Sequence, residues 1–260
     1  MNAAITDFKD GLSLWRVWFK LASRELLNSV KRTVLGPIWL IVHRIFFALA
    51  FSLFGAVLWG TKAGLNIDVL IGFMVFSTMI GYLQSANSAL ISTVNLAESG
   101  LPVSVRFLKS WAREFQLSML SGFVLLIASI ATGTFGLKII FLISALTILM
   151  SLWGLGLMFA ISPAALRFRD VAQIITFAST ILMFFSPIFW KIEDIKNKEL
   201  ANKLLEFNPI AEYIFIFRDL INLGIIDGFN LIRASIQTII ILGIGFVSFS
   251  LTRRRIPYWS

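Results

Sequence analysis

The chain contains no cysteine and only one histidine among its 260 residues. Without cysteine it can form no disulfide, and it has neither a thiolate nucleophile nor a cysteine ligand for a metal. The single histidine, His43, lies inside a long apolar run, and no nucleophile elbow accompanies it. No H-E-x-x-H sequence occurs either. We therefore expect no catalytic residue and no metal site in this chain.

Acidic residues are also few. Only 14 residues are Asp or Glu, and they are almost absent from the long apolar runs, which argues against a proton relay like that of a pump. The chain has no G-x-x-x-x-G-K-[ST] sequence, so it cannot hold the phosphates of ATP in a P-loop. Residues 1–11 hold no apolar core, and we expect no cleaved signal peptide. The function classes that remain are transport and scaffolding, and we expect the chain to need no cofactor.

Hydrophobic residues, by contrast, make up 58% of the chain, and the mean hydropathy is +0.85. Soluble domains are about 45–50% apolar, so the composition predicts an integral membrane protein. The formal charge of +9 could indicate nucleic acid as a partner. In a membrane protein, anionic lipid headgroups and the topology explain such a charge better, and we expect no nucleic-acid partner.

Six apolar runs are long enough, at about 20 residues, to cross a bilayer as helices. Trp39 and Trp59 lie near the two ends of the first run, where interfacial anchors are found. The predicted fold class is all-α, a polytopic membrane protein with six transmembrane helices. The predicted spans are 35–59, 67–90, 115–135, 139–164, 171–189 and 229–251.

A further helix is predicted at residues 8–26, before the first span. Apolar and aromatic residues recur there at spacings of three and four, and a second stripe with the same spacing carries Lys9, Arg16 and Lys20. This pattern is typical of an amphipathic helix on a membrane surface. The alternative is a core-facing helix of a small soluble domain, although no other soluble stretch exists for it to pack on.

The distribution of Lys and Arg indicates the orientation. With a cytoplasmic N-terminus, the inner segments hold 14 Lys and Arg and the outer segments hold 8. Both basic termini are then cytoplasmic, and the number of full crossings is even. We expect one permease domain over 1–260. It has an interfacial part at 1–34, five spans at 35–190, an outer gate segment at 191–228, a sixth span at 229–251 and a basic tail at 252–260.

The outer gate segment follows a break at Ser186-Pro187. Asn208-Pro209 is a helix-start signal, and the apolar run after it, 210–223, ends at Gly224. At about 14 residues the run is too short to cross a bilayer. It could be an amphipathic helix on the outer surface, or a re-entrant helix that dips into the membrane and returns. Its sparse charges favour the second interpretation, with Asn208, Pro209 and Arg218 as gate residues.

Two inner loops are candidates for docking to a cytoplasmic partner. Pro102 can start a short basic helix over 103–113. Its alternative is a simple positively charged linker. The second loop, 166–170, is a smaller candidate of the same kind. The predicted docking residues are Pro102, Arg106, Phe107 and Trp111 in the first loop and Arg167, Arg169 and Asp170 in the second.

The order of these features resembles that of the membrane subunit of bacterial ABC exporters for polysaccharides, of the O-antigen, capsule or teichoic acid type. Leu35-Gly36-Pro37-Ile38-Trp39 is similar to their L-G-x-x-W entry to the first span, and Phe207-Asn208-Pro209 through Arg218 is similar to their outer motif. The resemblance covers nearly the whole chain. One departure is His43-Arg44, near a position where the family often has a proline.

The resemblance implies a homodimer in the bacterial inner membrane, with the path between the protomers. It also implies a separate P-loop ATPase subunit under each protomer and a lipid-linked glycan carried on undecaprenyl pyrophosphate or a similar lipid. Aromatic rings suit the C–H faces of sugars, and Tyr82 and Trp153 are our candidates for the path. Arg44, with His43, could meet the pyrophosphate. Alternatively, Arg44 extends to the inner headgroups.

Other functions stay open from the sequence. A related one is an ABC permease that exports a drug or a lipid. A membrane-embedded enzyme acting on lipid-linked sugars would need acidic catalytic residues at a membrane face, where only Glu98, Glu114 and Asp170 are available. A secondary transporter is disfavoured by the lack of buried acids and of a detectable inverted repeat.

Overall fold

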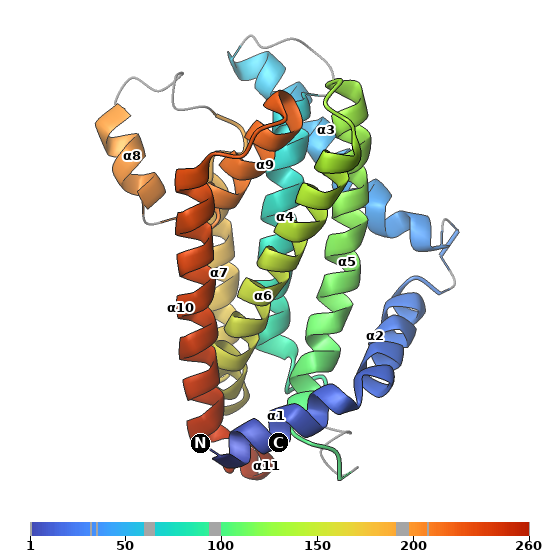
Figure 1. Ribbon diagram of the computed structural model, residues 1–260, viewed down its shortest axis with the longest axis vertical. Coiled ribbons are helices and arrows are strands. Elements are labelled where there is room, and N and C mark those ends of the chain that lie inside the picture. The colour runs from blue at the N-terminus through green and yellow to red at the C-terminus, as the bar shows by residue number, and fades with distance from the viewer. Residues whose placement is uncertain are drawn as a thin grey trace.

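The computed structural model describes residues 2–31, 33–34, 36–59, 66–93, 100–190, 198–206 and 208–259. Within these ranges the regular structure is helical and no strand occurs, which confirms the all-α part of the predicted fold class. Figure 1 shows a bundle with both chain termini at one end and α8 and α9 at the other. The elements are α1 (Asn2–Ser13), α2 (Trp15–Ser29), the 3-10 helix η1 (Gly36–Ile38), α3 (Trp39–Trp59), α4 (Ile67–Ser88), α5 (Ser104–Ala131), α6 (Leu137–Arg167), α7 (Asp170–Phe185), α8 (Lys198–Glu206), α9 (Ala211–Leu223), α10 (Gly228–Thr252) and α11 (Ile256–Trp259).

Four of these helices, α4, α5, α6 and α10, are long and apolar enough to cross a membrane. The chain is therefore a multi-pass membrane protein. The predicted first and fifth spans correspond to α3 and α7, whose apolar stretches, 39–54 and 170–185, are shorter. α3 lies beside one half of α4: Ser52 meets the residue before α4, and Arg44 meets Thr78 at the middle of α4.

The bundle is built around α6, which packs most extensively on α10, α4 and α5. Small residues allow the close approach. A Cβ on Gly245 of α10 would overlap the carbonyl oxygen of Gly156 in α6, and a Cβ on Gly154 would overlap the ring of Tyr82 in α4. The sequence pair Gly154 and Gly156 therefore marks tight helix packing, as small residues in membrane helices commonly do.

The inner basic helix and the third span, expected to be separate at 103–113 and 115–135, form the single helix α5. No Gly or Pro interrupts residues 104–121, and the charged side chains near its start bond to α2 and α4. A polar stretch can thus continue the helix without leaving the bundle. The prediction of two separate elements was wrong for this physical reason.

The predicted N-terminal helix at 8–26 is divided into α1 and α2 by Leu14. Trp18 and Ala22 of α2 are buried, and the Trp18 ring packs edge-on against Trp111 of α5. Trp15 and Phe19 point outward and are exposed. α2 therefore packs on α5 with one face and exposes aromatic rings on another.

The outer apolar run forms α9, which starts at Ala211 and ends before Gly224 in a left-handed conformation with φ of 70°. Most of α9 is buried, because it packs against α4, α10, α6 and α5. It is therefore held inside one end of the bundle, opposite the chain termini (Figure 1). Phe207, which belongs to the outer motif, lies outside the described residues, as does Leu35 of the entry motif.

Candidate functional site

At the end of the bundle that holds α9, Asn208 links two segments. Its amide nitrogen donates to the Ser186 hydroxyl at 2.9 Å, and its side-chain oxygen accepts from the backbone N–H of Ile210 at 2.9 Å. The predicted capping role is thus carried out as a turn just before α9, and Pro209 lies half-buried within that turn. The same side chain fixes the chain that follows α7.

Arg218 holds the middle of α9. Its guanidinium donates to the carbonyl oxygens of Ile188, at 2.9 Å, and Asp68, at 3.2 Å. Gly72 of α4 makes room for it, since a Cβ there would lie 3.3 Å from the Arg218 Nη2. Arg218 therefore joins α9 to the start of α4 and to the segment after α7.

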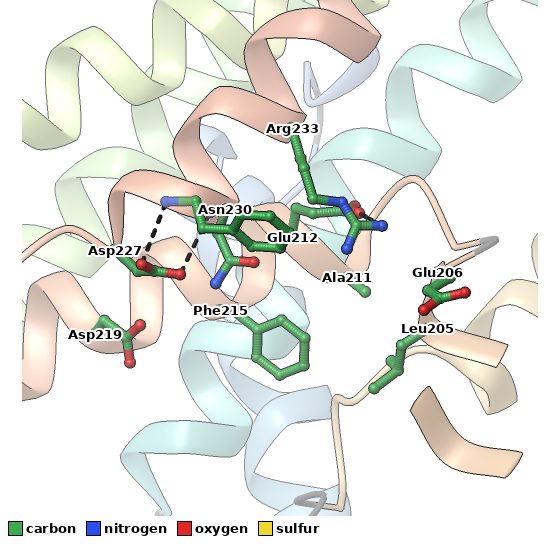
Figure 2. Close-up of a pocket in the computed structure, with 10 residues that line it drawn as sticks. Leu205, Glu206, Ala211, Glu212, Phe215, Asp219, Asp227, Asn230 and Arg233 are labelled. Carbon is green, nitrogen blue, oxygen red and sulfur yellow. Dashed lines mark hydrogen bonds and ion pairs between the residues drawn. The ribbon is translucent and has the colours of Figure 1, made fainter. Parts of the chain in front are cut away.

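The two ends of α9 have further partners. The hydroxyls of Thr132 and Thr134 both donate to the carbonyl oxygen of Ile221, at 2.6 and 2.7 Å. Near the start of the helix, Glu212 pairs with Arg233 of α10 at 2.9 Å (Figure 2). Polar contacts thus join α9 to α4, to α10 and to the segments that follow α5 and α7, in addition to the packing of its apolar face.

In the interior, polar side chains follow the contact between α4 and α5. The Arg44 guanidinium donates to Ser121 and to Thr78, the second at 3.4 Å. Further along the same contact, Tyr82 meets Ser118 at 3.2 Å and Ser85 donates to Glu114 at 2.7 Å. We refer to Thr78, Tyr82, Ser85, Glu114, Ser118 and Ser121 as the α4–α5 seam.

The four predicted path residues do not share one surface. Arg44, Tyr82 and Trp153 are buried within the chain. The neighbouring His43 is exposed on α3, with its ring 5.8 Å from that of Phe47. The structure therefore brings Arg44 to the α4–α5 seam, while the side chain of His43 beside it stays exposed.

At the end of the bundle that holds the termini, Asp7 of α1 is only 4% exposed. Its carboxylate accepts from the backbone N–H groups of Ser104, at 2.9 Å, and Val103, at 3.2 Å, and from the Arg253 Nε at 2.8 Å. α5 has no cap from its own N-terminal residue, so Asp7 supplies the capping carboxylate from another helix. One side chain thus joins α1, the start of α5 and the end of α10.

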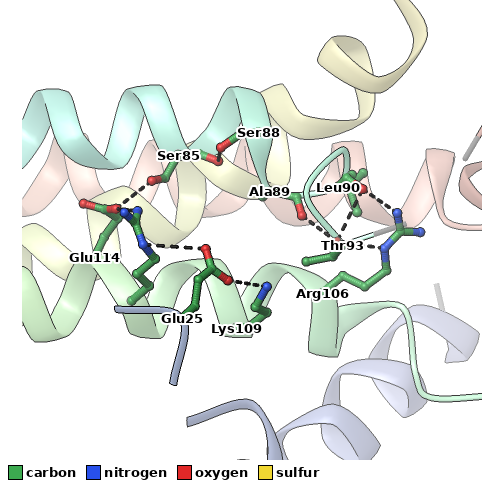
Figure 3. Close-up of polar contacts among 10 residues, drawn as sticks. Glu25, Ser85, Ser88, Ala89, Leu90, Thr93, Arg106, Lys109 and Glu114 are labelled. Carbon is green, nitrogen blue, oxygen red and sulfur yellow. Dashed lines mark hydrogen bonds and ion pairs between the residues drawn. The ribbon is translucent and has the colours of Figure 1, made fainter. Parts of the chain in front are cut away.

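The basic residues near the start of α5 also have partners within the chain (Figure 3). Glu25 of α2 pairs with Lys109 and lies 3.6 Å from Arg113, which in turn pairs with Glu114 at 2.7 Å. Arg106 is buried and donates to the Thr93 hydroxyl at 3.0 Å and to the carbonyl oxygen of Leu90. These cations hold α2 and the turn after α4 against α5.

The apolar docking residues lie inside as well. Phe107 is fully buried, with its ring 4.9 Å from that of Phe159 and 5.5 Å from that of Phe249. Trp111 donates from its indole nitrogen to the carbonyl oxygen of Ser151 at 2.8 Å. Pro102 is half-buried at the start of this helix, and residues 94–99 of the loop lie outside the described residues.

The second predicted docking loop is more accessible. Arg169 and Asp170 are exposed, and the Arg167 guanidinium lies 5.1 Å from the Phe168 ring and 5.3 Å from the Trp259 ring. Beside it, Tyr258 of the C-terminal helix is 88% exposed. Of the predicted docking residues, those around α11 therefore offer the most exposed side chains. Among the described residues, no group of three or more His, Cys, Asp or Glu is placed to hold a metal ion.

Comparison with protein families shows which family the chain belongs to. Residues 16–221, most of the chain, match the ABC-2 type transporter family. The chain belongs to the ABC-2 type transporter family. It is a permease, the membrane subunit of an ABC transporter. No curated protein matches the chain.

Several residues of this ABC-2 permease were not found from its sequence. Asp7 and Glu25 are the main ones, because their partners lie far away in the chain and no spacing encodes the contact. Gly81 is another: a Cβ there would lie 2.8 Å from Glu114 Oε2, so glycine leaves room for the buried carboxylate. For Glu114, an acidic residue next to a predicted span was the one available signal.

Proposed function

We propose that this ABC-2 permease exports a lipid-linked cell-envelope polysaccharide, of the O-antigen, capsule or teichoic acid type, across the bacterial inner membrane. A second copy of the chain completes the path, and two copies of a separate P-loop ATPase drive it. The observation that carries the proposal is the outer segment. Its resemblance to glycan exporters rests on Asn208-Pro209 and Arg218, and two of these residues fix α9 in the bundle.

In this proposal the chain crosses the membrane six times, with both termini cytoplasmic. α4, α5, α6 and α10 are the long spans. α3, with 21 residues, is about 31 Å long and α7, with 16 residues, about 24 Å. The bilayer core is about 30 Å thick, so α7 needs the adjoining residues or a local thinning of the bilayer. α9 is the re-entrant helix, because it is too short to cross and is buried among the spans.

We infer that the path lies against α3 and α7, which both pack on α4 and leave most of their described side chains unburied. Exposed aromatic rings on α3 include Phe46, and those on α7 include Phe177 and Phe184. Such rings offer weak and repeated contacts, which let a moving polymer be released. His43 faces this side. Arg44 reaches the path only if α3 moves away from α4. Tyr82 and Trp153 are buried among α4, α5 and α6, and reach the path only if these helices separate as well.

For coupling, the ATPase would contact the end of the bundle that holds both termini. The exposed contacts would come from Arg169 and Asp170, with Arg167 and Pro102 beside them. Arg106, Phe107 and Trp111 are bonded or packed inside the protein, so we assign them to transmitting the movement rather than to touching the ATPase.

The decisive experiment is purification from the native membrane in gentle detergent, followed by mass spectrometry. We expect a P-loop ATPase and an undecaprenyl-linked glycan to accompany the permease. Adding that glycan to the reconstituted complex should stimulate ATP hydrolysis at least twofold, whereas small amphipathic drugs should not. Stimulation by drugs alone would assign the protein to drug export, and the absence of any ATPase would contradict the proposal as a whole.

A further inference from the structure

A cavity of about 480 Å³ opens between α8, α9 and the start of α10 (Figure 2). Its volume lies in the range of about 300–1,000 Å³ that is typical of small-molecule sites. Two aromatic rings, those of Phe215 and Phe229, contribute to its wall. The site lies away from the α4–α5 seam and from the cytoplasmic contacts, and nothing described so far gives it a role.

The wall of this cavity has an excess of negative charge. Four carboxylates, those of Glu206, Glu212, Asp219 and Asp227, line it together with one guanidinium, that of Arg233. Arg233 is already engaged, because it pairs with Glu212 at 2.9 Å and lies 5.5 Å from the Phe229 ring. Three carboxylates are thus left without a compensating cation among the lining residues.

Two of the carboxylates lack hydrogen-bond donors. Glu212 is 3% exposed, and its Oε2 accepts no hydrogen bond from the described part of the chain. Asp219 is half-buried, and the same part of the chain offers it neither a hydrogen bond nor an ion pair. Burial, and then the nearby charge of Asp227, raise the pKa of Asp219 above its usual value, against the opposing effect of Arg218. Buried acceptors of this kind ordinarily have a partner.

We propose that this cavity binds a primary ammonium group carried on a neutral, hydroxylated ring, which is the chemistry of an amino sugar. Carboxylates attract the ammonium group strongly where water is partly excluded, and the phenyl rings can contact both the cation and the C–H face of the ring. An amine that also carries phosphate, such as an ethanolamine phospholipid headgroup, would bring an anion toward three uncompensated carboxylates. That the bound amino sugar belongs to the exported substrate rests on the proposed glycan export. That the cavity binds an amino sugar does not depend on it.

The test uses the purified permease alone in phosphatidylcholine nanodiscs, with binding measured by calorimetry. The four probes are glucosamine, N-acetylglucosamine, glucose and phosphoethanolamine. We expect glucosamine to bind at least tenfold more tightly than each of the other three. Asp219→Asn and Glu206→Gln, which lie on different helices, should each weaken glucosamine binding at least fivefold. Glu199→Gln is the matched control, since Glu199 is an exposed acid of α8 outside the cavity, and it should leave binding unchanged.

Equal binding of glucosamine and N-acetylglucosamine would overturn the proposal, because the two differ in the charge of the nitrogen. Phosphoethanolamine binding as tightly as glucosamine would overturn it in favour of a headgroup site. Thermal unfolding of each variant shows whether it is folded, and if Asp219→Asn does not fold, Glu206→Gln decides. The assay needs neither ATPase nor export, so failure of the binding site and failure of the export proposal can be told apart.

Discussion

At the scale of single residues, Asp7 bonds across a longer stretch of the chain than Arg218, which the sequence pointed to. Its contacts reach Ser104, 97 positions away, and Arg253, 246 positions away. One carboxylate therefore sets the position of α1 relative to the start of α5 and the end of α10. A movement imposed on α1 by an ATPase would be passed on to both helices through this contact.

We predict that Asp7→Ala destabilises the protein by about 1–2 kcal/mol, the size of a lost helix cap with some loss of ion pairing. Asp7→Asn keeps a side-chain acceptor and should cost less. Both should reduce the amount of substrate exported per ATP more than they reduce abundance. Thermal unfolding and coupled export assays measure the two effects. If export per ATP stays at the wild-type value in folded Asp7→Ala, the residue serves stability alone.

The glycines of α10 give a second prediction. A Cβ on Gly245 would overlap the backbone of α6, whereas a Cβ on Gly243 would have no atom within 4 Å. Gly245→Ala should therefore cost about 1–3 kcal/mol, as overpacking typically does, and lower the melting temperature. Gly243→Ala is the matched control two residues away and should be neutral. Equal melting temperatures would mean that α6 and α10 do not approach this closely.

Substitutions of Arg44 give a third prediction, in which export should change while abundance does not. Its partners Thr78 and Ser121 also donate to carbonyl oxygens of their own helices, at 2.8 and 3.2 Å. Replacing Arg44 by leucine thus leaves no hydroxyl without a partner, and Arg44→Leu should reach normal abundance. If Arg44 meets the carrier pyrophosphate, Arg44→Leu should abolish export and Arg44→Lys should be partly defective. Unimpaired export in Arg44→Leu would end that assignment.

At the scale of elements, the sequence was sufficient to predict the bounds of a helix where one apolar run forms that helix. The predicted spans 67–90, 139–164 and 229–251 differ from α4, α6 and α10 by a few residues. The start of α5 could not be predicted, because its charges are satisfied by Glu25 of α2 and by the turn after α4, and such partners are not visible in local sequence. Helix propensity can be estimated from the local sequence. Whether the charged side chains of a helix must face water depends on which other segments pack against it.

The same distinction applies to the site residues. Asn208 was found because a helix start has a local signal, and its side chain does form the turn before α9. Its second bond, to Ser186, has no local signal. Phe107 was expected on a docking face because of its spacing from Trp111, yet it is buried between α6 and α10. A periodic pattern identifies a face of a helix without saying what covers it.

Asn208 also gives the prediction for α9. Asn208→Ala removes both bonds of this side chain, at a cost of about 1 kcal/mol. That is small against folding but large for a gate whose states differ by a few kcal/mol. We expect solute leak through reconstituted permease to rise while abundance stays normal. Ser186→Ala, which removes one bond, should have a smaller effect, and Asn28→Ala, at an exposed asparagine of α2, should have none. Equal loss of abundance and export would instead make the role structural.

At the scale of the whole molecule, the orientation is the property that the remaining proposals depend on. Both termini lie at one end of the bundle and α8 and α9 at the other (Figure 1). The inner segments hold 14 Lys and Arg against 8 in the outer segments. Positive residues favour the cytoplasmic side, so the end with the termini is expected to be cytoplasmic. An even number of crossings follows, which four long spans alone would also satisfy. α3 and α7 are expected to cross as well, because each links elements at opposite ends of the bundle. α6 ends beside Trp259 and α10 begins beside α9, while α2 packs on the start of α5 and α4 begins beside α9.

Single cysteines test this topology directly, since the chain has none of its own. With a reagent that does not pass the membrane of intact cells, cysteines at outer positions should be labelled and those at inner positions should not. We expect labelling at Lys62, Lys138 and Lys203, and none at Lys31, Arg169 or Tyr258. Tyr258 is a strict negative position, because its 88% exposure means that burial cannot explain a lack of labelling. Protection at Lys203 together with Arg169 would show that α7 does not cross, and labelling at Lys31 would show the same for α3. External labelling at Tyr258 would overturn the orientation itself, and the proposed docking of an ATPase to that end would go with it.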